Sequence, residues 1–86
     1  MGLLWEDRAW NDYMYWYTQD KKTVKRINAL IKDIQRNAFS GIGKPEALKN
    51  NLSGLWSRRI NECDRIVYYK QDDIIHIVSC RSHYDD

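Results

Sequence analysis

The sequence predicts a single α+β domain, residues 1–86, in which two N-terminal helices pack on one face of a twisted antiparallel sheet, in the order β-α-α-β-β-β. Apolar residues recur at helical spacing between residues 7 and 37, whereas apolar and polar residues alternate between residues 55 and 81. Hydrophobic residues make up 43% of the chain, and there are only four glycines and one proline. This composition favours a folded domain over a disordered chain.

The first half of the chain predicts a strand followed by two helices. Gly2–Trp5 is a short apolar strand, and residues 7–19 form a helix because large apolar side chains recur on one face: Trp10, Tyr13, Met14 and Tyr17. Asp20 can cap a second helix that runs to about Asn37. Its apolar stripe is Val24, Ile27, Leu30, Ile31 and Ile34. The tight junction at Asp20 predicts an antiparallel helix pair.

The second half predicts a loop and three strands. Residues 39–54 contain helix- and strand-breaking residues throughout, namely Gly41, Gly43, Pro45, Asn50, Asn51 and Gly54. Strands are expected near residues 55–61, 65–70 and 74–81. The polar connections at residues 62–64 and 71–73 are short enough to be hairpin loops.

Alternation along these strands predicts which residues share a face of the sheet. If each hairpin loop has three residues, Ile60 opposes Ile66 and Lys70 opposes Ile74. Even-numbered residues then face the helices: Trp56, Ile60, Ile66, Tyr68, Ile74, His76, Val78 and Cys80. Odd-numbered residues lie on the helix-free face with His83 just beyond the last strand: Ser57, Arg59, Arg65, Ser79 and Arg81. A bulge in either hairpin would exchange the faces of the following residues.

Charge is unevenly distributed along the chain. From Lys21 to Arg59 there are ten lysines and arginines but only two acidic residues, Asp33 and Glu46. This basic middle indicates either an anionic partner or two solvated helix faces.

The sequence shows no apolar run long enough to cross a bilayer and no signal peptide, so we expect a cytoplasmic protein with no membrane partner. Cys63 and Cys80 lie in no metal-binding spacing, so we expect reduced thiols, no metal site and no cofactor.

Four residues of the expected helix-free side could together cleave RNA. RNA carries its own nucleophile, the 2′-hydroxyl, so cleavage needs a base, an acid and cations that stabilise charge on phosphorus. Glu46 and His83 can act as base and acid, because a carboxylate and an imidazole can both be tuned toward neutral pKa values. Arg59 and Arg65 can hold the phosphate oxygens. These residue types also have plainer structural explanations, since Pro45–Glu46 is an ordinary helix start and strand arginines often only solubilise a face.

Further candidates surround this set. Tyr84 could stack on an unpaired base, and Lys44 and Lys49 flank Glu46 where they could bind phosphates. Arg81 belongs to the same expected face and is a further candidate for RNA or ribosome binding.

Three segments carry a resemblance to a known family. The run Gly43–Ile60, the strand Arg65-Ile66-Val67-Tyr68 and the closing Cys80-Arg81-Ser82-His83-Tyr84 are similar to those of the YoeB-type toxins of the RelE family, and the likeness extends from residue 5 to residue 84. The resemblance implies a fold of the microbial-ribonuclease kind and cleavage of messenger RNA in the ribosomal A site. It implies that Glu46 is the general base, His83 the general acid and Arg65 the group that stabilises the transition state, while Lys49, Arg59 and Tyr84 bind or position RNA.

The same resemblance implies the partners. These are a YefM-type antitoxin with an acidic C-terminal segment, the 70S ribosome carrying a message, operator DNA reached only through the antitoxin, and a second toxin copy in a homodimer. Asp64, where the family commonly has His, is expected to pair with Arg65, and Asp85 and Asp86 to oppose RNA. Two other functions fit the same scaffold: a ParE-type gyrase inhibitor, or a non-enzymatic corepressor that binds the antitoxin.

Overall fold

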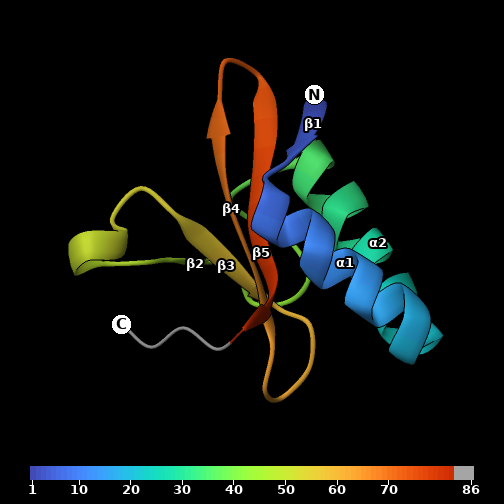
Figure 1. Ribbon diagram of the computed structural model, residues 1–86. Helices are drawn as coiled ribbons and strands as arrows, with labels where there is room; N and C mark the ends of the chain where they lie inside the picture. Colours follow the sequence, from blue (N-terminus) through green and yellow to red (C-terminus); the bar gives the residue numbers. More distant parts are fainter. Residues whose placement is uncertain (83–86) are drawn as a thin grey trace.

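The computed structural model describes residues 1–82, and two helices cover one face of a five-stranded sheet (Figure 1). The strands are β1 (Gly2–Trp5), β2 (Glu46–Ala47), β3 (Trp56–Arg59), β4 (Arg65–Gln71) and β5 (Ile74–Ser82), and their order in the sheet is β1-β5-β4-β3-β2. The predicted α+β class is therefore confirmed. The sheet is mixed rather than wholly antiparallel, because β1 runs parallel to β5.

The two helices end where the sequence predicts. Helix α1 spans Asp7–Gln19 and α2 spans Lys21–Arg36. The Asp20 side chain caps α2 by accepting hydrogen bonds from the backbone N–H groups of Lys22 and Thr23. One face of α2 is buried in the core against the sheet: Val24, Ile27, Leu30, Ile31 and Ile34. None of the helices in the described part of the chain is long and apolar enough to span a bilayer.

Helix α1 also covers an edge of the sheet. Strand β1 pairs with only the first half of β5, so the second half of β5 has a free edge on that side. The Asp12 carboxylate accepts the N–H of Cys80 at 3.0 Å, and the Trp16 indole donates to the Cys80 carbonyl at 2.8 Å. Side chains of α1 therefore occupy backbone groups that a neighbouring strand would otherwise bind.

The β3–β4 hairpin differs from the predicted register by two residues. Arg58 opposes Ile66, and the Ile60 N–H donates to the Asp64 carbonyl. The predicted pairing of Ile60 with Ile66 is therefore wrong. Because a shift of two residues keeps every side chain on its face, the prediction that Arg59 and Arg65 share the helix-free face is confirmed.

The β4–β5 hairpin differs by one residue, which exchanges the faces. The turn consists of Asp72 and Asp73 alone, with φ values of 55° and 60°, so Gln71 and not Lys70 opposes Ile74. Two-residue hairpins favour this left-handed backbone because it matches strand twist. Ile75 and Ile77 are consequently buried in the core. The expectation of a core position for His76 is wrong, because its ring stacks on Tyr69 at 4.4 Å on the other face.

Two register shifts follow along β5. The first lies between the Tyr68 and Val67 pairings and returns Ser79 to the predicted helix-free face, opposite Val67. The second lies between the Val67 and Arg65 pairings, so that Ser82 opposes Arg65. At this second irregularity the Arg81 guanidinium lies 3.4 Å from the ring centroid of Tyr15 on α1. The prediction that Arg81 lies with the other arginines of the helix-free face is therefore wrong.

Candidate active site

A row of four residues crosses the helix-free face of the sheet. The pairings of β2, β3, β4 and β5 place Glu46 opposite Ser57, Ser57 opposite Val67, and Val67 opposite Ser79. Glu46 is exposed, whereas the other three side chains are fully buried. Residue 46 was predicted to lie in a loop, but it begins β2, so a strand fixes its carboxylate on this face.

The next row along the strands holds two cations. Arg59 opposes Arg65, and Arg65 in turn opposes Ser82. Side chains opposed across antiparallel strands have Cβ atoms about 4.5–5.5 Å apart. Within residues 1–82 no hydrogen bond or ion pair engages either guanidinium, so both can bind an anion. The expected pairing of Asp64 with Arg65 is not formed, because the Asp64 carboxylate accepts from Asn61 instead.

The chain segment between α2 and β3 places Glu46 beside these arginines. The Arg59 N–H donates to the Gly43 carbonyl at 2.7 Å, and the Leu48 N–H donates to the Leu55 carbonyl at 2.9 Å. These two bonds hold the segment 43–48 along β3 on either side of Glu46. Gly43 has φ of 79°, and an added Cβ would lie 2.7 Å from a methyl carbon of Leu30, so both conformation and space require glycine.

The two candidate lysines lie on either side of β2. Lys44 is exposed with φ of 53°, and Lys49 is exposed at the start of the short 3₁₀ helix η1 (Asn50–Leu52). Between Glu46 and Lys49, Leu48 is buried and anchors the segment to the protein. The cationic side chains therefore flank the Glu46 carboxylate along the chain, as the sequence suggested.

Ser57 is a site residue that the sequence did not single out. Its hydroxyl is fully buried and makes no hydrogen bond within the described residues. It lies directly across from Glu46 in the β2–β3 pairing. Its place on the helix-free face was predictable from alternation, but nothing in the sequence distinguished it from an ordinary strand serine.

His83 and Tyr84, the candidate acid and base-stacking residues, lie outside the described residues. Strand β5 is described to Ser82, which opposes Arg65. His76, the other histidine of the chain, lies farther along the same face and stacks on Tyr69.

Cys80 takes no part in this arrangement. Its side chain is buried on the helix-bearing face, and its sulfur contacts the Ala9 carbonyl at 3.6 Å. Burial, reinforced by the carboxylates of Asp12 and Asp64, raises the pKa of the Cys80 thiol to about 12. A thiol with so high a pKa carries almost no thiolate at neutral pH, so Cys80 is a packing residue and not a nucleophile.

The helix-free face thus combines a carboxylate that can accept a proton with two guanidinium groups that can bind oxyanions. This arrangement suits acid–base chemistry on a phosphodiester, in which charge builds up on phosphoryl oxygens.

Known proteins resemble the chain over nearly its whole length. A family model described as "YoeB-like toxin of bacterial type II toxin-antitoxin system" matches residues 5–84. Toxin YoeB of Escherichia coli strain K12 is 56% identical over 84 residues, which cover 98% of this chain and 100% of the relative. Toxin YoeB of Streptomyces coelicolor is 50% identical with the same coverage.

Solved structures show the same similarity. A YoeB/ParE toxin from Agrobacterium tumefaciens superposes with a TM-score of 0.93 at 41% identity, covering 98% of this chain and 100% of that one. A toxin chain in the heterotetrameric YoeB–YefM complex of Staphylococcus aureus superposes with a TM-score of 0.90 at 50% identity, covering 98% of both chains.

Proposed function

This chain belongs to the YoeB-like toxin family of bacterial type II toxin–antitoxin systems, and we propose that it is a metal-independent endoribonuclease that cuts messenger RNA in the ribosomal A site. The observation that carries the proposal is the strand register. It aligns Glu46 with Ser57 in one row and Arg59 with Arg65 in the next, on the helix-free face. A gyrase inhibitor or a corepressor would not need this combination.

The proposed reaction is transfer of the phosphoryl group to the neighbouring ribose hydroxyl. Glu46 accepts the 2′-hydroxyl proton while the 2′-oxygen attacks phosphorus. The bond to the 5′-oxygen of the next nucleotide breaks, and His83 protonates that oxygen. The products are a 2′,3′-cyclic phosphate and a 5′-hydroxyl. Acid–base assistance of this kind contributes roughly 10²–10⁴-fold in rate.

The cations of the site have separate proposed roles. Arg65 stabilises the charge that develops on the phosphoryl oxygens, because a guanidinium is always charged and offers two parallel donors. Arg59, Lys44 and Lys49 hold the RNA backbone, and Tyr84 positions the base at the cleavage point. Arg81 is left out of this set, because its guanidinium lies over the Tyr15 ring.

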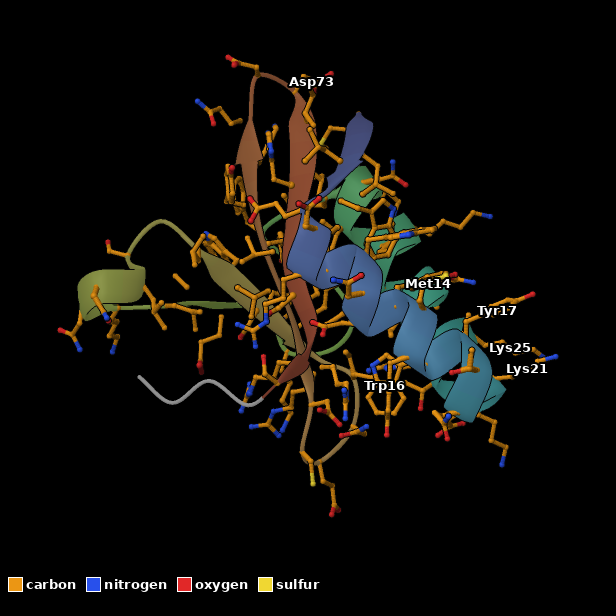
Figure 2. The ribbon with its side chains drawn as sticks, in the orientation of Figure 1. Met14, Trp16, Tyr17, Lys21, Lys25 and Asp73 are labelled. Atoms are coloured by element: carbon orange, nitrogen blue, oxygen red, sulfur yellow. The ribbon has the colours of Figure 1, made fainter. Side chains whose placement is uncertain are left out.

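We propose a YefM-type antitoxin as the partner that restrains this activity, and the support is that YoeB of Staphylococcus aureus forms a heterotetrameric complex with YefM. An acidic antitoxin segment would be attracted to the basic middle of the chain. Figure 2 shows Lys21 and Lys25 close to Tyr17 at the far end of the α1–α2 pair, away from β2. Operator DNA would be reached through the antitoxin, and a homodimer is proposed from the Staphylococcus aureus YoeB dimer.

The test is cleavage of message on purified 70S ribosomes. Glu46→Gln and His83→Ala should each abolish cleavage and growth inhibition while leaving antitoxin binding intact. Glu62→Gln is the matched control, since Glu62 is exposed in the β3–β4 turn. This variant is expected to cleave message as the wild-type protein does. Full toxicity of Glu46→Gln would contradict the assigned chemistry and favour the gyrase inhibitor, whereas intact ribosome-bound message with the wild-type protein would favour the corepressor.

Metal independence needs a substrate without ribosomes, because ribosomes themselves require Mg²⁺. Cleavage of purified RNA should persist in EDTA. An absolute requirement for a divalent ion would contradict the proposed chemistry.

A further inference from the structure

Arg58 is completely buried, and most of its hydrogen bonds go to one short segment of backbone. Its Nη2 donates to the carbonyls of Asn37 and Ser40 at 2.6 and 3.0 Å, and its Nη1 donates to the carbonyl of Ile42 at 3.1 Å. All three acceptors belong to residues 37–42, which leave α2 and lead toward β2 and which we call the connector. A single guanidinium therefore holds the connector backbone at three points.

Two further buried side chains complete this contact. Asp33 on α2 pairs with Arg58 and accepts the Ile42 N–H at 2.9 Å. The Tyr68 hydroxyl accepts from Arg58 Nε at 3.1 Å and donates to the Ala38 carbonyl at 2.7 Å. We call Asp33, Arg58 and Tyr68 the connector clamp. It joins α2, β3 and β4 to residues 37–42.

The clamp fits the connector closely and holds its carboxylate ionised. A Cβ on Gly41 would lie 1.9 Å from Asp33 Oδ2 and 3.0 Å from Arg58 Nη1, so no side chain fits at this point. The backbone N–H of Ile42, followed by the Arg58 guanidinium, keeps the pKa of Asp33 below its usual range. A charge-assisted network with every partner engaged resists displacement, because each broken bond would leave a buried polar group unsatisfied.

The clamp and the candidate base are linked by a short stretch of chain. Only Gly43, Lys44 and Pro45 separate Ile42, the last clamped residue, from Glu46. Proline restricts one of these residues, and the Gly43 carbonyl is hydrogen-bonded by Arg59, the neighbour of Arg58 in β3. The position of residues 37–42 therefore limits where Glu46 can lie, together with the two hydrogen bonds that hold segment 43–48 along β3.

We propose that the connector clamp is a positioning device for Glu46, in which Arg58 acts from the helix-bearing face on a carboxylate that lies on the opposite face. The inference rests on the proposed function, since it assumes that Glu46 is the general base. The clamp residues do not touch RNA. Their role is to hold the carboxylate within reach of the 2′-hydroxyl, where a displacement of about 1 Å can cost roughly 10²-fold in rate.

The test measures kcat and KM for cleavage of ribosome-bound message by Arg58→Lys and Tyr68→Phe. Arg58→Lys keeps the positive charge but loses the guanidinium group that donates hydrogen bonds through three nitrogens. Tyr68→Phe removes only the hydroxyl that joins Arg58 to the Ala38 carbonyl. Arg36→Gln is the matched control, because Arg36 pairs with the same Asp33 carboxylate from the exposed side and its guanidinium donates no hydrogen bond to the backbone of residues 37–42. The folded fraction of each variant is determined by circular dichroism under the assay conditions, and rates are expressed per folded molecule.

We expect both clamp variants to lose roughly 10- to 100-fold in kcat, with KM within about twofold of wild type, and Arg36→Gln to match wild type. A purely structural role would lower the folded fraction and leave kcat per folded molecule unchanged, and that result in Tyr68→Phe would overturn the inference. Glu46→Gln is measured alongside. If it cleaves normally, the assignment of Glu46 as general base, on which the inference rests, fails, whereas an inactive Glu46→Gln beside a fully active Tyr68→Phe rejects the clamp alone.

Discussion

Arg58 and Arg59 are consecutive residues of β3 with identical side chains and opposite environments. Arg58 points to the helix-bearing face, is fully buried and engages Asp33, Tyr68 and three backbone carbonyls. Arg59 points to the helix-free face and is exposed, and its guanidinium has no partner within residues 1–82. Strand alternation alone separates a structural cation from one that is available to a ligand.

The two faces of the sheet also differ in how their other polar groups are hydrogen-bonded. On the helix-bearing face, every buried side-chain nitrogen or oxygen within residues 1–82 has a hydrogen-bond partner, and Arg58 and Tyr68 also bind the backbone carbonyls of Asn37 and Ala38. On the helix-free face, counting residues 1–82, the Ser57 hydroxyl is buried without a hydrogen-bond partner, and neither the Arg59 nor the Arg65 guanidinium makes a hydrogen bond or ion pair. The two guanidinium groups are open to solvent and so remain available to an anion, and the ligand that we propose for them is the phosphate of RNA.

The sharpest way to break this comparison is to remove each arginine in turn and measure stability. Arg58→Ala should lower the free energy of unfolding by about 3–5 kcal/mol, because it leaves the Asp33 carboxylate buried without its main cation. Arg59→Ala should change it by no more than about 0.5 kcal/mol. Urea unfolding followed by tryptophan fluorescence measures both, and equal losses would refute the distinction between the faces.

Arg65 gives the corresponding prediction for activity. Arg65→Ala should lower kcat for message cleavage by roughly 10²–10³-fold, because it removes a preorganised donor from the developing charge. Arg65→Lys should recover only part of this loss, since an ammonium cannot donate two parallel bonds. The thermal unfolding midpoint of each variant is the control and should stay near that of wild type. Complete recovery by Lys would mean that charge alone matters at this position.

A smaller effect is expected at the turn that determines which residues of β5 face the core. Asp72 and Asp73 both adopt left-handed backbone, which costs an L-residue roughly 1–2 kcal/mol. Asp73→Gly should therefore stabilise the protein by up to about 1 kcal/mol, measured from the urea midpoint. Asp73→Val, which is more strained at the same φ, should destabilise it. A stabilising Val would show that the turn is not of this type.

The smallest effect concerns the exposed end of the helix layer. The hydrogen bonds from Thr23 to Asp20, first from its hydroxyl and then from its backbone N–H, keep the pKa of Asp20 below its ordinary value of 3.8. A lowered carboxyl pKa contributes stability that is present above the unfolded value and is lost as pH falls through the folded one. Asp20→Asn keeps a capping oxygen but cannot titrate. Its unfolding free energy should therefore fall less steeply than that of wild type between about pH 5 and pH 2, and an unchanged slope would contradict this prediction.

The sequence predicted most of the fold because local patterns decide it. Helical periodicity and the Asp20 cap located both helices, and alternation located β3, β4 and β5. Parallel pairing of β1 with β5 was missed, since it joins the two ends of the chain and leaves no local signal. The face of His76 was predicted wrongly, because the sequence Gln71-Asp72-Asp73 is compatible with both a two-residue turn and a three-residue loop. The two alternatives differ by one residue in the β4–β5 register, which exchanges the faces of the sheet.

For the candidate site, sequence reasoning grouped the cations of β3 and β4 correctly. Odd-numbered residues of these strands share one face, and a register shift of two residues leaves them on that face. Arg81 was misplaced because simple alternation does not predict the two register shifts in the β4–β5 pairing, and the Arg81 guanidinium lies over the Tyr15 ring of α1. The connector clamp could not be foreseen. Tyr68 was expected to face the helices, but Asp33, Arg58 and Tyr68 lie far apart in the chain and no local pattern shows that they meet.

The covering of β5 by Asp12 and Trp16 has a consequence for behaviour in concentrated solution. Unpaired strand edges recruit strands from other molecules and start ordered aggregates. Here the N–H and carbonyl of Cys80, in the second half of β5, are already bound by side chains of α1, and the two outer strands of the sheet have only four and two residues. Edge-to-edge pairing between copies therefore has little unpaired backbone to start from, although 43% of the residues are hydrophobic.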